Sequence, residues 1–180
     1  MIHSYKDKYN RVMLGPLKIE NIESLRILRN KQRNWFIYSE ELTKEDQIKW
    51  FENYNLKKND YMFSIHPINQ QDRFIGAVAL YGINEESKTA EFGRLIIDKE
   101  TAKEKGLGYD ATMCACTIGF EQIGLNKILL EVFEENISAI KTYQKACFDF
   151  IKSEKLDNGK NLVHMQLTIE KFKNLVKGNK

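Results

Sequence analysis

The loop from Lys103 to Gly108 has a composition that suits a phosphate ligand, since it reads Lys-Glu-Lys-Gly-Leu-Gly. Its two glycines, Gly106 and Gly108, would let backbone N–H groups approach a ligand without interference from side chains. The helix expected after the loop adds about half a positive charge at its N-terminus. Lys103 and Lys105 would add full charges at the rim. The loop therefore predicts a phosphate site, and the alternative is a plain turn that exposes its lysines to water.

Two other nucleotide-binding motifs fit this loop less well. A P-loop needs Lys followed by Ser or Thr directly after its last glycine, and here Tyr109 follows, which excludes that site. Gly106, Gly108 and Ala111 do satisfy the dinucleotide pattern G-x-G-x-x-A. Glu131 also lies near the acidic position expected downstream. That motif should open the first βα unit, whereas roughly 100 residues precede the loop. Dinucleotide binding is therefore a remote alternative.

A second group of residues shares one face of a predicted helix. Asn136 can cap the start of this helix, because its side chain can accept from free N–H groups of the first turn. Helical spacing places Ala139, Ile140, Tyr143 and Cys147 on the same face. A phenol with a pKa of ~10 is protonated at neutral pH and can act as a proton donor. Tyr143 is thus a candidate general acid, unless its ring only packs.

The hydrophobic pattern predicts the elements that would position these residues. Thr43 and Asp46 resemble a capping box, so a helix should begin there. The apolar run from Leu95 to Ile97 is typical of a strand buried on both faces. The lysine-rich end, 171–180, is expected to fray. In chain order the pattern predicts helices at 17–32 and from 43, strands at 61–65, 73–83 and 89–98, a buried helix after 108, a strand at 128–133, a helix at 136–147, and a final hairpin at 148–155 and 161–169.

This order predicts an α/β fold with a mixed, mostly antiparallel sheet flanked by helices, in a single domain over 1–180. The chain of 180 residues is 42% hydrophobic and long enough to form a core without metal or disulfide staples. Its formal charge of +3 is too small for a nucleic-acid footprint. Three cysteines, Cys114, Cys116 and Cys147, fit neither a disulfide framework nor a zinc site, so we expect no metal. With no apolar run of membrane-spanning or signal-peptide type, a cytoplasmic protein without a membrane partner is expected.

The loop and the helix together resemble two motifs of the GNAT superfamily, the acetyl-CoA-dependent N-acetyltransferases. Residues 103–108 are similar to the pyrophosphate loop Q/R-x-x-G-x-G/A, and residues 136–148 are similar to N-x-x-A-x-x-x-Y-x-K-x-G-F. The order of predicted elements matches this family over essentially the whole chain. Lys103 departs from the usual Gln or Arg, and Cys147 departs from the usual Gly. Lysine keeps the charge but loses the fork of donors.

The resemblance implies direct transfer of an acetyl group from acetyl-CoA to an amine, with Tyr143 as general acid. No acyl-enzyme is needed, so the cysteines are expected to be inert core thiols. Residues 95–97 would pair with the pantetheine arm like an extra strand, and their main-chain groups would hold the oxyanion of the thioester. The cofactor site implied by the resemblance consists of Leu95, Ile96, Ile97, Lys103, Lys105, Gly106, Leu107, Gly108, Tyr109 and Asn136.

The general base is less clearly indicated by the sequence. Glu91 precedes the apolar run on the same predicted strand, where related enzymes often carry a carboxylate that acts through water. By pKa alone, His66 and His164 are alternatives. Each of these three residues also suits an ordinary place on a strand. Glu91 is therefore the candidate, with both histidines left open.

The acceptor amine is expected to bind near the N-terminal half, which shapes that site in this superfamily. Residues 28–30 and 47–51 resemble the subgroup that acetylates nucleotide-linked amino sugars, as in the pseudaminic-acid pathway. Arg29, next to Asn30, could bind phosphate, and an aromatic residue such as Trp50 could stack on a base or sugar. The alternatives are a ribosomal-protein or peptide N-terminal acetyltransferase and, remotely, a non-catalytic acyl-CoA sensor. The resemblance also suggests a homodimer through the last strands.

Overall fold

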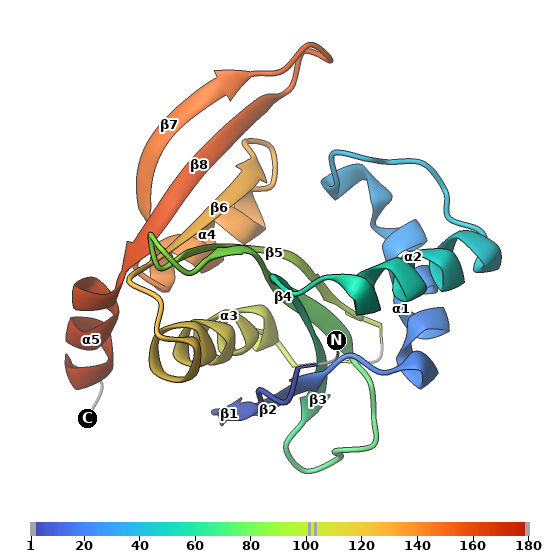
Figure 1. Ribbon diagram of the computed structural model, residues 1–180. Helices are drawn as coiled ribbons and strands as arrows, with labels where there is room; N and C mark the ends of the chain where they lie inside the picture. Colours follow the sequence, from blue (N-terminus) through green and yellow to red (C-terminus); the bar gives the residue numbers. More distant parts are fainter. Residues whose placement is uncertain (1–2, 101, 103, 179–180) are drawn as a thin grey trace.

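Within residues 3–100, 102 and 104–178, which the computed structural model describes, eight strands form one sheet in the order β1-β2-β3-β4-β5-β6-β8-β7 (Figure 1). Neighbouring strands are antiparallel, except that β5 and β6 run parallel because the chain crosses between them through α3. The strands are β1 (Asp7–Tyr9), β2 (Val12–Pro16), β3 (Asp60–Pro67), β4 (Gly76–Asn84), β5 (Thr89–Ile97), β6 (Lys127–Phe133), β7 (Asp149–Lys155) and β8 (Asn161–Thr168). The helices are α1 (Ile22–Lys31), α2 (Lys44–Leu56), α3 (Leu107–Thr117), α4 (Ile137–Lys145) and α5 (Ile169–Gly178).

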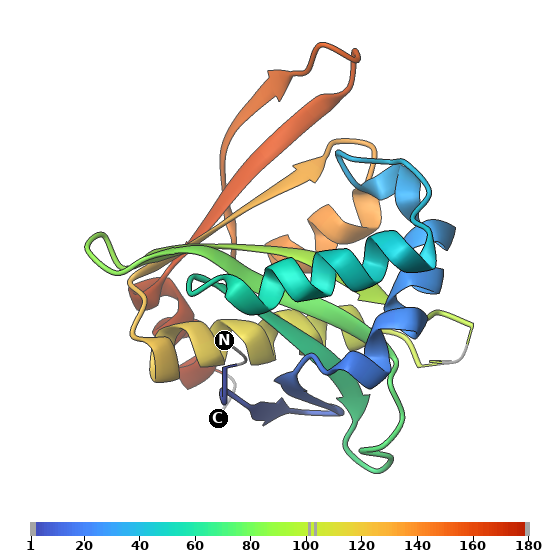
Figure 2. The same ribbon diagram turned by 45° about the vertical axis from the view of Figure 1, so that its right-hand side comes forward.

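The helices lie on both faces of the sheet, and each face has its own apolar cluster (Figures 1 and 2). Helices α1 and α2 cover one face, where Leu25 and Phe51 pack with Met62 of β3. Helices α3, α4 and α5 contribute to the cluster on the other face, which contains Met113 and Phe92. Alternate residues of a strand point to opposite faces. The central strands can therefore present different side chains to two separate layers.

The mixed, mostly antiparallel sheet predicted from the sequence is confirmed, as are several of its local features. The capping box at the start of α2 is present, since Asp46 N donates to Thr43 Oγ1 at 3.1 Å and Thr43 N donates to Asp46 Oδ2 at 3.0 Å. Helix α3 is buried along most of its length. Asn136 caps α4, because its Oδ1 accepts from Ala139 N at 3.2 Å. Short polar side chains at helix starts thus marked real boundaries.

The sequence analysis missed two strands at the N-terminus, and its prediction of a frayed C-terminal end was wrong. The N-terminal strands β1 and β2 were missed, because they are short and the second contains Gly15 and Pro16. Residues 169–178 do not fray but form α5; residues 179–180 lie outside the described part of the chain. Phe172 of α5 is buried, with its ring centroid 4.9 Å from that of Phe120. The lysines of this segment obscured its apolar face.

Helix α4 ends in a Schellman motif that fixes the position of Tyr143. Phe148 N donates to Tyr143 O at 3.0 Å, and Cys147 N donates to Gln144 O at 2.9 Å. The rings of Tyr143 and Phe148 also pack together, with centroids 6.0 Å apart. Cys147 has a φ of +65°, in the left-handed region that favours glycine. The departure from the family pattern at this position is therefore a source of backbone strain.

We predict that Cys147→Gly raises the free energy of unfolding by about 1 kcal/mol, because glycine adopts the left-handed conformation without the Cβ clash. Urea unfolding of the purified protein measures this change. Cys147→Ala is the matched control, since it removes the thiol but keeps the strain. Equal stabilities of the Gly and Ala variants would contradict the assignment.

Candidate active site

A cavity of about 920 Å³ lies where β5 and β6 diverge. Among the described residues these strands pair only from Thr89 to Phe92, opposite Lys127 to Leu130. Beyond that point residues 93–97 of β5 and 131–133 of β6 line the cavity from two sides. The lining also includes residues of α1 and α2 from one face of the sheet and of α3 and α4 from the other. One cavity therefore reaches both faces through the opening in the sheet.

A β-bulge in β5 accompanies this divergence. Ala79 pairs with Gly93 and Ala77 with Ile96, so β5 has one extra residue over this stretch. Arg94, within the bulge, has a φ of +52°. Its Nη1 donates to both carboxylate oxygens of buried Asp60, at 2.7 and 3.0 Å, which holds the irregular backbone in place. The bulge turns the end of β5 away from β6.

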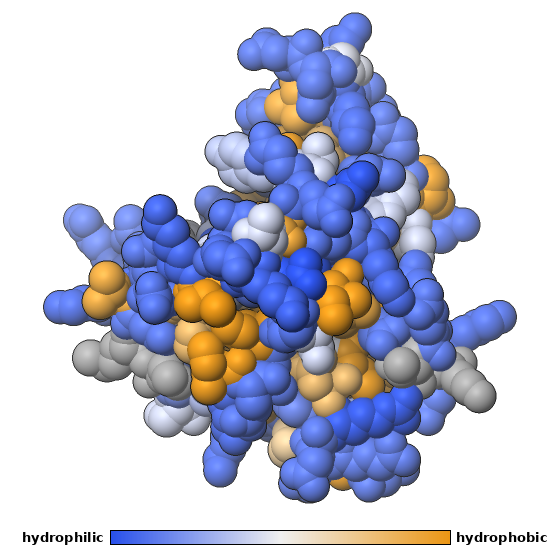
Figure 3. Space-filling model, turned by 90° about the vertical axis from the view of Figure 1, so that its right-hand side faces the viewer, coloured by the Kyte–Doolittle hydropathy of each residue, from blue (hydrophilic) through white to orange (hydrophobic). Residues whose placement is uncertain are grey.

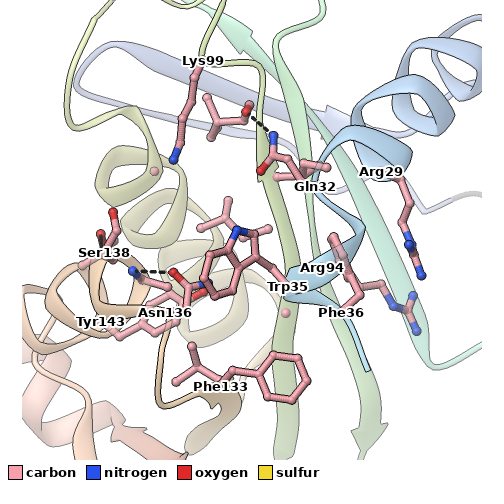
Figure 4. A pocket seen from close by; sticks show the side chains of 18 of the residues that line it. Arg29, Gln32, Trp35, Phe36, Arg94, Lys99, Phe133, Asn136, Ser138 and Tyr143 are labelled. Carbon is pink, nitrogen blue, oxygen red and sulfur yellow. Dashed lines mark hydrogen bonds between the residues drawn. The ribbon is translucent and has the colours of Figure 1, made fainter. Parts of the chain in front are cut away.

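The prediction that the run from Leu95 to Ile97 is buried on both faces was wrong in part. Ile96 is buried, but Leu95 and Ile97 are half-buried, because β6 has moved away and the cavity takes its place. Ile97 O instead accepts a hydrogen bond from Gln32 Nε2 at 2.9 Å (Figure 4). All three residues line the cavity. This edge of β5 can accept an extended ligand as an additional strand would pair.

The glycine loop lies at the N-terminus of α3, on the cavity wall. Gly106 is the N-cap with a φ of +90°, and a Cβ there would stand 2.9 Å from Arg11 Nη2. Arg11 holds the loop, since its Nη1 donates to Lys105 O at 2.9 Å and its Nε donates to Asp110 Oδ2 at 2.7 Å. Lys105, Leu107, Gly108 and Tyr109 line the cavity with Gly106, whereas Lys103 lies outside the described residues. The first turn of α3 thus directs its N–H groups toward this end of the cavity.

Tyr143 lines the cavity from α4, together with Asn136. Its side chain is 7% exposed and packs edge-on against Phe92, with ring centroids 5.7 Å apart. Burial raises the pKa of Tyr143 above its ordinary value. The phenol is therefore protonated at neutral pH and has a proton to donate. It lies with the apolar cluster on the α3 and α4 face of the sheet.

The candidate bases lie outside the cavity lining of the described residues. Glu91 faces Tyr81 across the β4–β5 ladder, and Tyr81 does line the cavity. His66 shares hydrogen bonds with Ser64 Oγ at 2.9 Å and Arg73 O at 3.1 Å. His164 lies between two carboxylates, Glu131 at 3.3 Å and Glu154 at 3.4 Å. Glu91 is next to the cavity residue Tyr81, and His164 is next to the cavity residue Glu131.

The acceptor residues expected from the sequence separate into two groups. Arg29 and Trp50 line the cavity, but Asn30 does not. The Asn30 side chain instead exchanges two hydrogen bonds of 2.9 Å with the main chain of Leu42, which fixes the connection between α1 and α2. The Arg29 guanidinium lies 4.4 Å from the Phe36 ring centroid and donates to Tyr38 O. Its Nη1 is buried without a partner among the described residues.

Figure 4 shows how the labelled side chains divide around the cavity. Arg29, Phe36 and Arg94 lie on one side, and Asn136, Ser138 and Tyr143 lie on the other. On the face that carries α1 and α2, apolar side chains form separate patches within a largely hydrophilic surface (Figure 3). Sequence reasoning missed Arg11, Gln32, Tyr81 and Arg94. Their partners lie far away in the sequence, such as Asp110, 99 residues beyond Arg11, so no local pattern marked them.

None of the three cysteines belongs to the described cavity lining. Cys114 and Cys116 are free and fully buried, and Cys147 is half-buried. Burial raises the pKa of Cys114 to about 12 and that of Cys116 further. In the described part of the chain, no three His, Cys, Asp or Glu side chains gather as a metal site would require, and no helix could cross a membrane.

Comparisons with known proteins identify the family. The sequence model of the acetyltransferase (GNAT) domain matches residues 11–149. The chain belongs to the GNAT acetyltransferases. These enzymes transfer an acetyl group from acetyl-CoA to an amine, so the family resemblance found in the sequence is confirmed. No curated protein matches the chain.

Solved structures share the GNAT fold with this chain at low sequence identity. Apo FdhC, a nucleotide-linked sugar GNAT, has a TM-score of 0.82 and 20% identity, over 98% of this chain and 97% of FdhC. Spermidine N-acetyltransferase from Vibrio cholerae, solved with CoA and spermine, has a TM-score of 0.80 and 23% identity, over 91% of this chain and 99% of that one. At these identities the likeness shows the fold alone.

We predict that Gly108→Ala in this GNAT chain weakens CoA binding at least ~10-fold, or about 1.4 kcal/mol. The added Cβ would meet only Leu95 Cδ2, at 4.0 Å, so the fold has room for it, but the methyl group would stand on the cavity wall. Calorimetric titration with CoA measures the change. Gly15→Ala is the matched control, because its Cβ would meet nothing within 4 Å. Unchanged affinity in Gly108→Ala would contradict a phosphate site at this loop.

Proposed function

We propose that this enzyme acetylates the amino group of a nucleotide-linked amino sugar, with acetyl-CoA as the acetyl donor. The observation that carries the proposal is Arg29, a cation on the cavity wall with one guanidinium nitrogen buried and unpartnered among the described residues. An unsatisfied donor of this kind favours a phosphate or carboxylate ligand. Burial lowers the pKa of Arg29, and an arginine remains charged despite such a shift.

The other cavity side chains near Arg29 support the same class of acceptor. Phe36 and Trp50 offer aromatic surface for a base or sugar ring. Arg94 is paired with Asp60, and the other cations of the described lining, Arg29, Lys99 and Lys105, still outnumber the acids Glu104 and Glu131. A polyamine carries several positive charges, which such a wall would repel. The charge balance therefore favours a phosphorylated acceptor over spermidine.

The chain's own groups match the acetyl donor in three places. The N-terminus of α3 and the main chain at Gly108 suit the pyrophosphate of CoA, and the free edge of β5 suits its extended arm. CoA supplies the acetyl group as a thioester, which an amine can attack directly. Main-chain N–H groups near the bulge at Arg94 can stabilise charge on the thioester oxygen. Tyr143 lies on the opposite side of the sheet from Arg29, where it can donate a proton to the departing thiolate.

A ligand panel tests the proposed function. Thermal unfolding is measured with acetyl-CoA, CoA, NAD, UDP or spermidine, each alone, since a ligand at 100 times its dissociation constant adds about 2.7 kcal/mol of stability. We expect midpoint shifts of several degrees with acetyl-CoA, CoA and UDP. Thiol release from acetyl-CoA then compares UDP-linked amino sugars with spermidine and peptides. A shift with NAD alone would contradict the donor, and acetylation of spermidine but no sugar would contradict the acceptor.

We predict that Tyr143→Phe lowers kcat at least ~100-fold with little change in KM for acetyl-CoA, because the phenol proton is needed only as the thiolate leaves. Steady-state thiol release measures both constants. Tyr38→Phe is the control, since the Tyr38 residue is exposed and its carbonyl oxygen, which accepts from Arg29, is kept by the substitution. A folded Tyr143→Phe variant with wild-type turnover would contradict the assignment of Tyr143 as the general acid.

We predict that Arg29→Gln raises KM for a nucleotide-linked acceptor about 10- to 100-fold, the effect of losing a charge-assisted hydrogen bond. The thermal shift with UDP should disappear, while the shift with CoA stays. Arg33→Gln is the matched control, because Arg33 pairs with Glu41 at 3.1 Å and does not line the cavity. If the two variants behave alike, Arg29 does not bind the acceptor.

A further inference from the structure

Tyr81 stands between Glu91 and the cavity. The two residues are direct cross-strand partners on β4 and β5, so their side chains share one face of the sheet. Tyr81 packs with the apolar cluster under α1 and α2, which places that face on the acceptor side. Tyr81 lines the cavity, whereas Glu91 is not part of the described lining. Tyr81 therefore lies between the cavity and Glu91 on the path of a proton from one to the other.

The position of the Tyr81 ring depends on Gly93. A Cβ on Gly93 would stand 3.0 Å from Tyr81 Oη and 3.1 Å from Cε1, so the ring lies across a residue that has no side chain. A second contact holds the Tyr81 ring, because the Arg94 guanidinium lies 4.2 Å from the ring centroid. Asp60 in turn fixes Arg94. The hydroxyl is thereby kept beside the bulge, where main-chain groups face the cavity.

The charged and titratable groups around Tyr81 come from four elements. Asp60 of β3 is the cross-strand partner of Tyr81 on that side, Glu91 and Arg94 belong to β5, Glu131 belongs to β6, and Tyr143 belongs to α4. Burial raises the pKa of Tyr81, and the neighbouring Glu91 carboxylate raises it further, while Arg94 opposes them. Tyr81 thus keeps its proton at neutral pH and can donate it to Glu91. A lone pair of its oxygen is then available to accept another proton.

We propose that Tyr81 is a proton relay that takes the proton of the attacking amine and passes its own to Glu91. As the C–N bond forms and the C–S bond breaks, the nitrogen loses one proton to Tyr81 Oη, and the Tyr81 hydroxyl proton moves to the Glu91 carboxylate. Tyr143 gives one proton to the sulfur. Glu91 ends protonated and Tyr143 deprotonated, and water restores both. The inference rests on the proposed acetyl transfer. It assigns the deprotonation of the attacking amine to two residues, Tyr81 and Glu91.

Tyr81→Phe, Glu91→Gln and the double variant test this relay. Each single variant should lower kcat/KM about 100-fold and flatten the same acid limb of its pH profile, because both remove one path. The double variant should be no slower than either single variant, as expected for residues that act as a unit. Tyr61→Phe is the matched control, since Tyr61 is a half-buried strand tyrosine outside the described cavity lining.

The acceptor in these assays is whichever amine the parent enzyme acetylates, so failure of the sugar acceptor leaves the relay test intact. The thermal shift with CoA is measured for each variant and should equal that of the parent. Near-parent kcat/KM in Tyr81→Phe, or losses that multiply in the double variant, would overturn the relay. If thiol is released from acetyl-CoA equally fast when no amine is added, the proposed acetyl transfer is wrong, and the relay with it.

Discussion

The opening between β5 and β6 is the constraint on which the site depends. A parallel pair normally continues its ladder, because unpaired main-chain groups are costly when buried. Here the pair stops after Phe92, and the bulge at Arg94 turns β5 aside. Main-chain groups that a neighbouring strand would have used are left facing a cavity. The sheet itself, through its gap, supplies the polar groups that acyl transfer needs.

The gap also separates the two proton transfers of the proposed mechanism. Tyr143 belongs to the layer of α3 and α4, and Tyr81 belongs to the layer of α1 and α2. In that mechanism the thioester lies in the gap. The amine attacks it from the layer of α1 and α2, and the thiolate leaves on the side of α3 and α4. Two tyrosines with raised pKa values can therefore serve different steps without competing for one proton.

The sequence predicted those parts of the molecule whose information is local. The cap of Asn136, the capping box at Thr43 and the glycine loop depend on residues within a few positions of one another, so their spacing was sufficient. The supports of the site are different. Arg94 meets Asp60 across 34 residues, and Arg11 meets Asp110 across 99. Such pairs form only when the sheet has assembled, so the hydrophobic periodicity of the sequence does not predict them.

The left-handed Cys147 has a consequence for motion as well as for stability. Tyr143 lies in the last turn of α4, and its carbonyl oxygen accepts the hydrogen bond that closes the helix. The backbone strain at Cys147, directly after the helix end, lowers the free energy needed to open that turn locally. Tyr143, the proposed proton donor, would then lie in one of the more easily opened parts of the helix. Such local opening would move Tyr143 relative to the cavity that it lines.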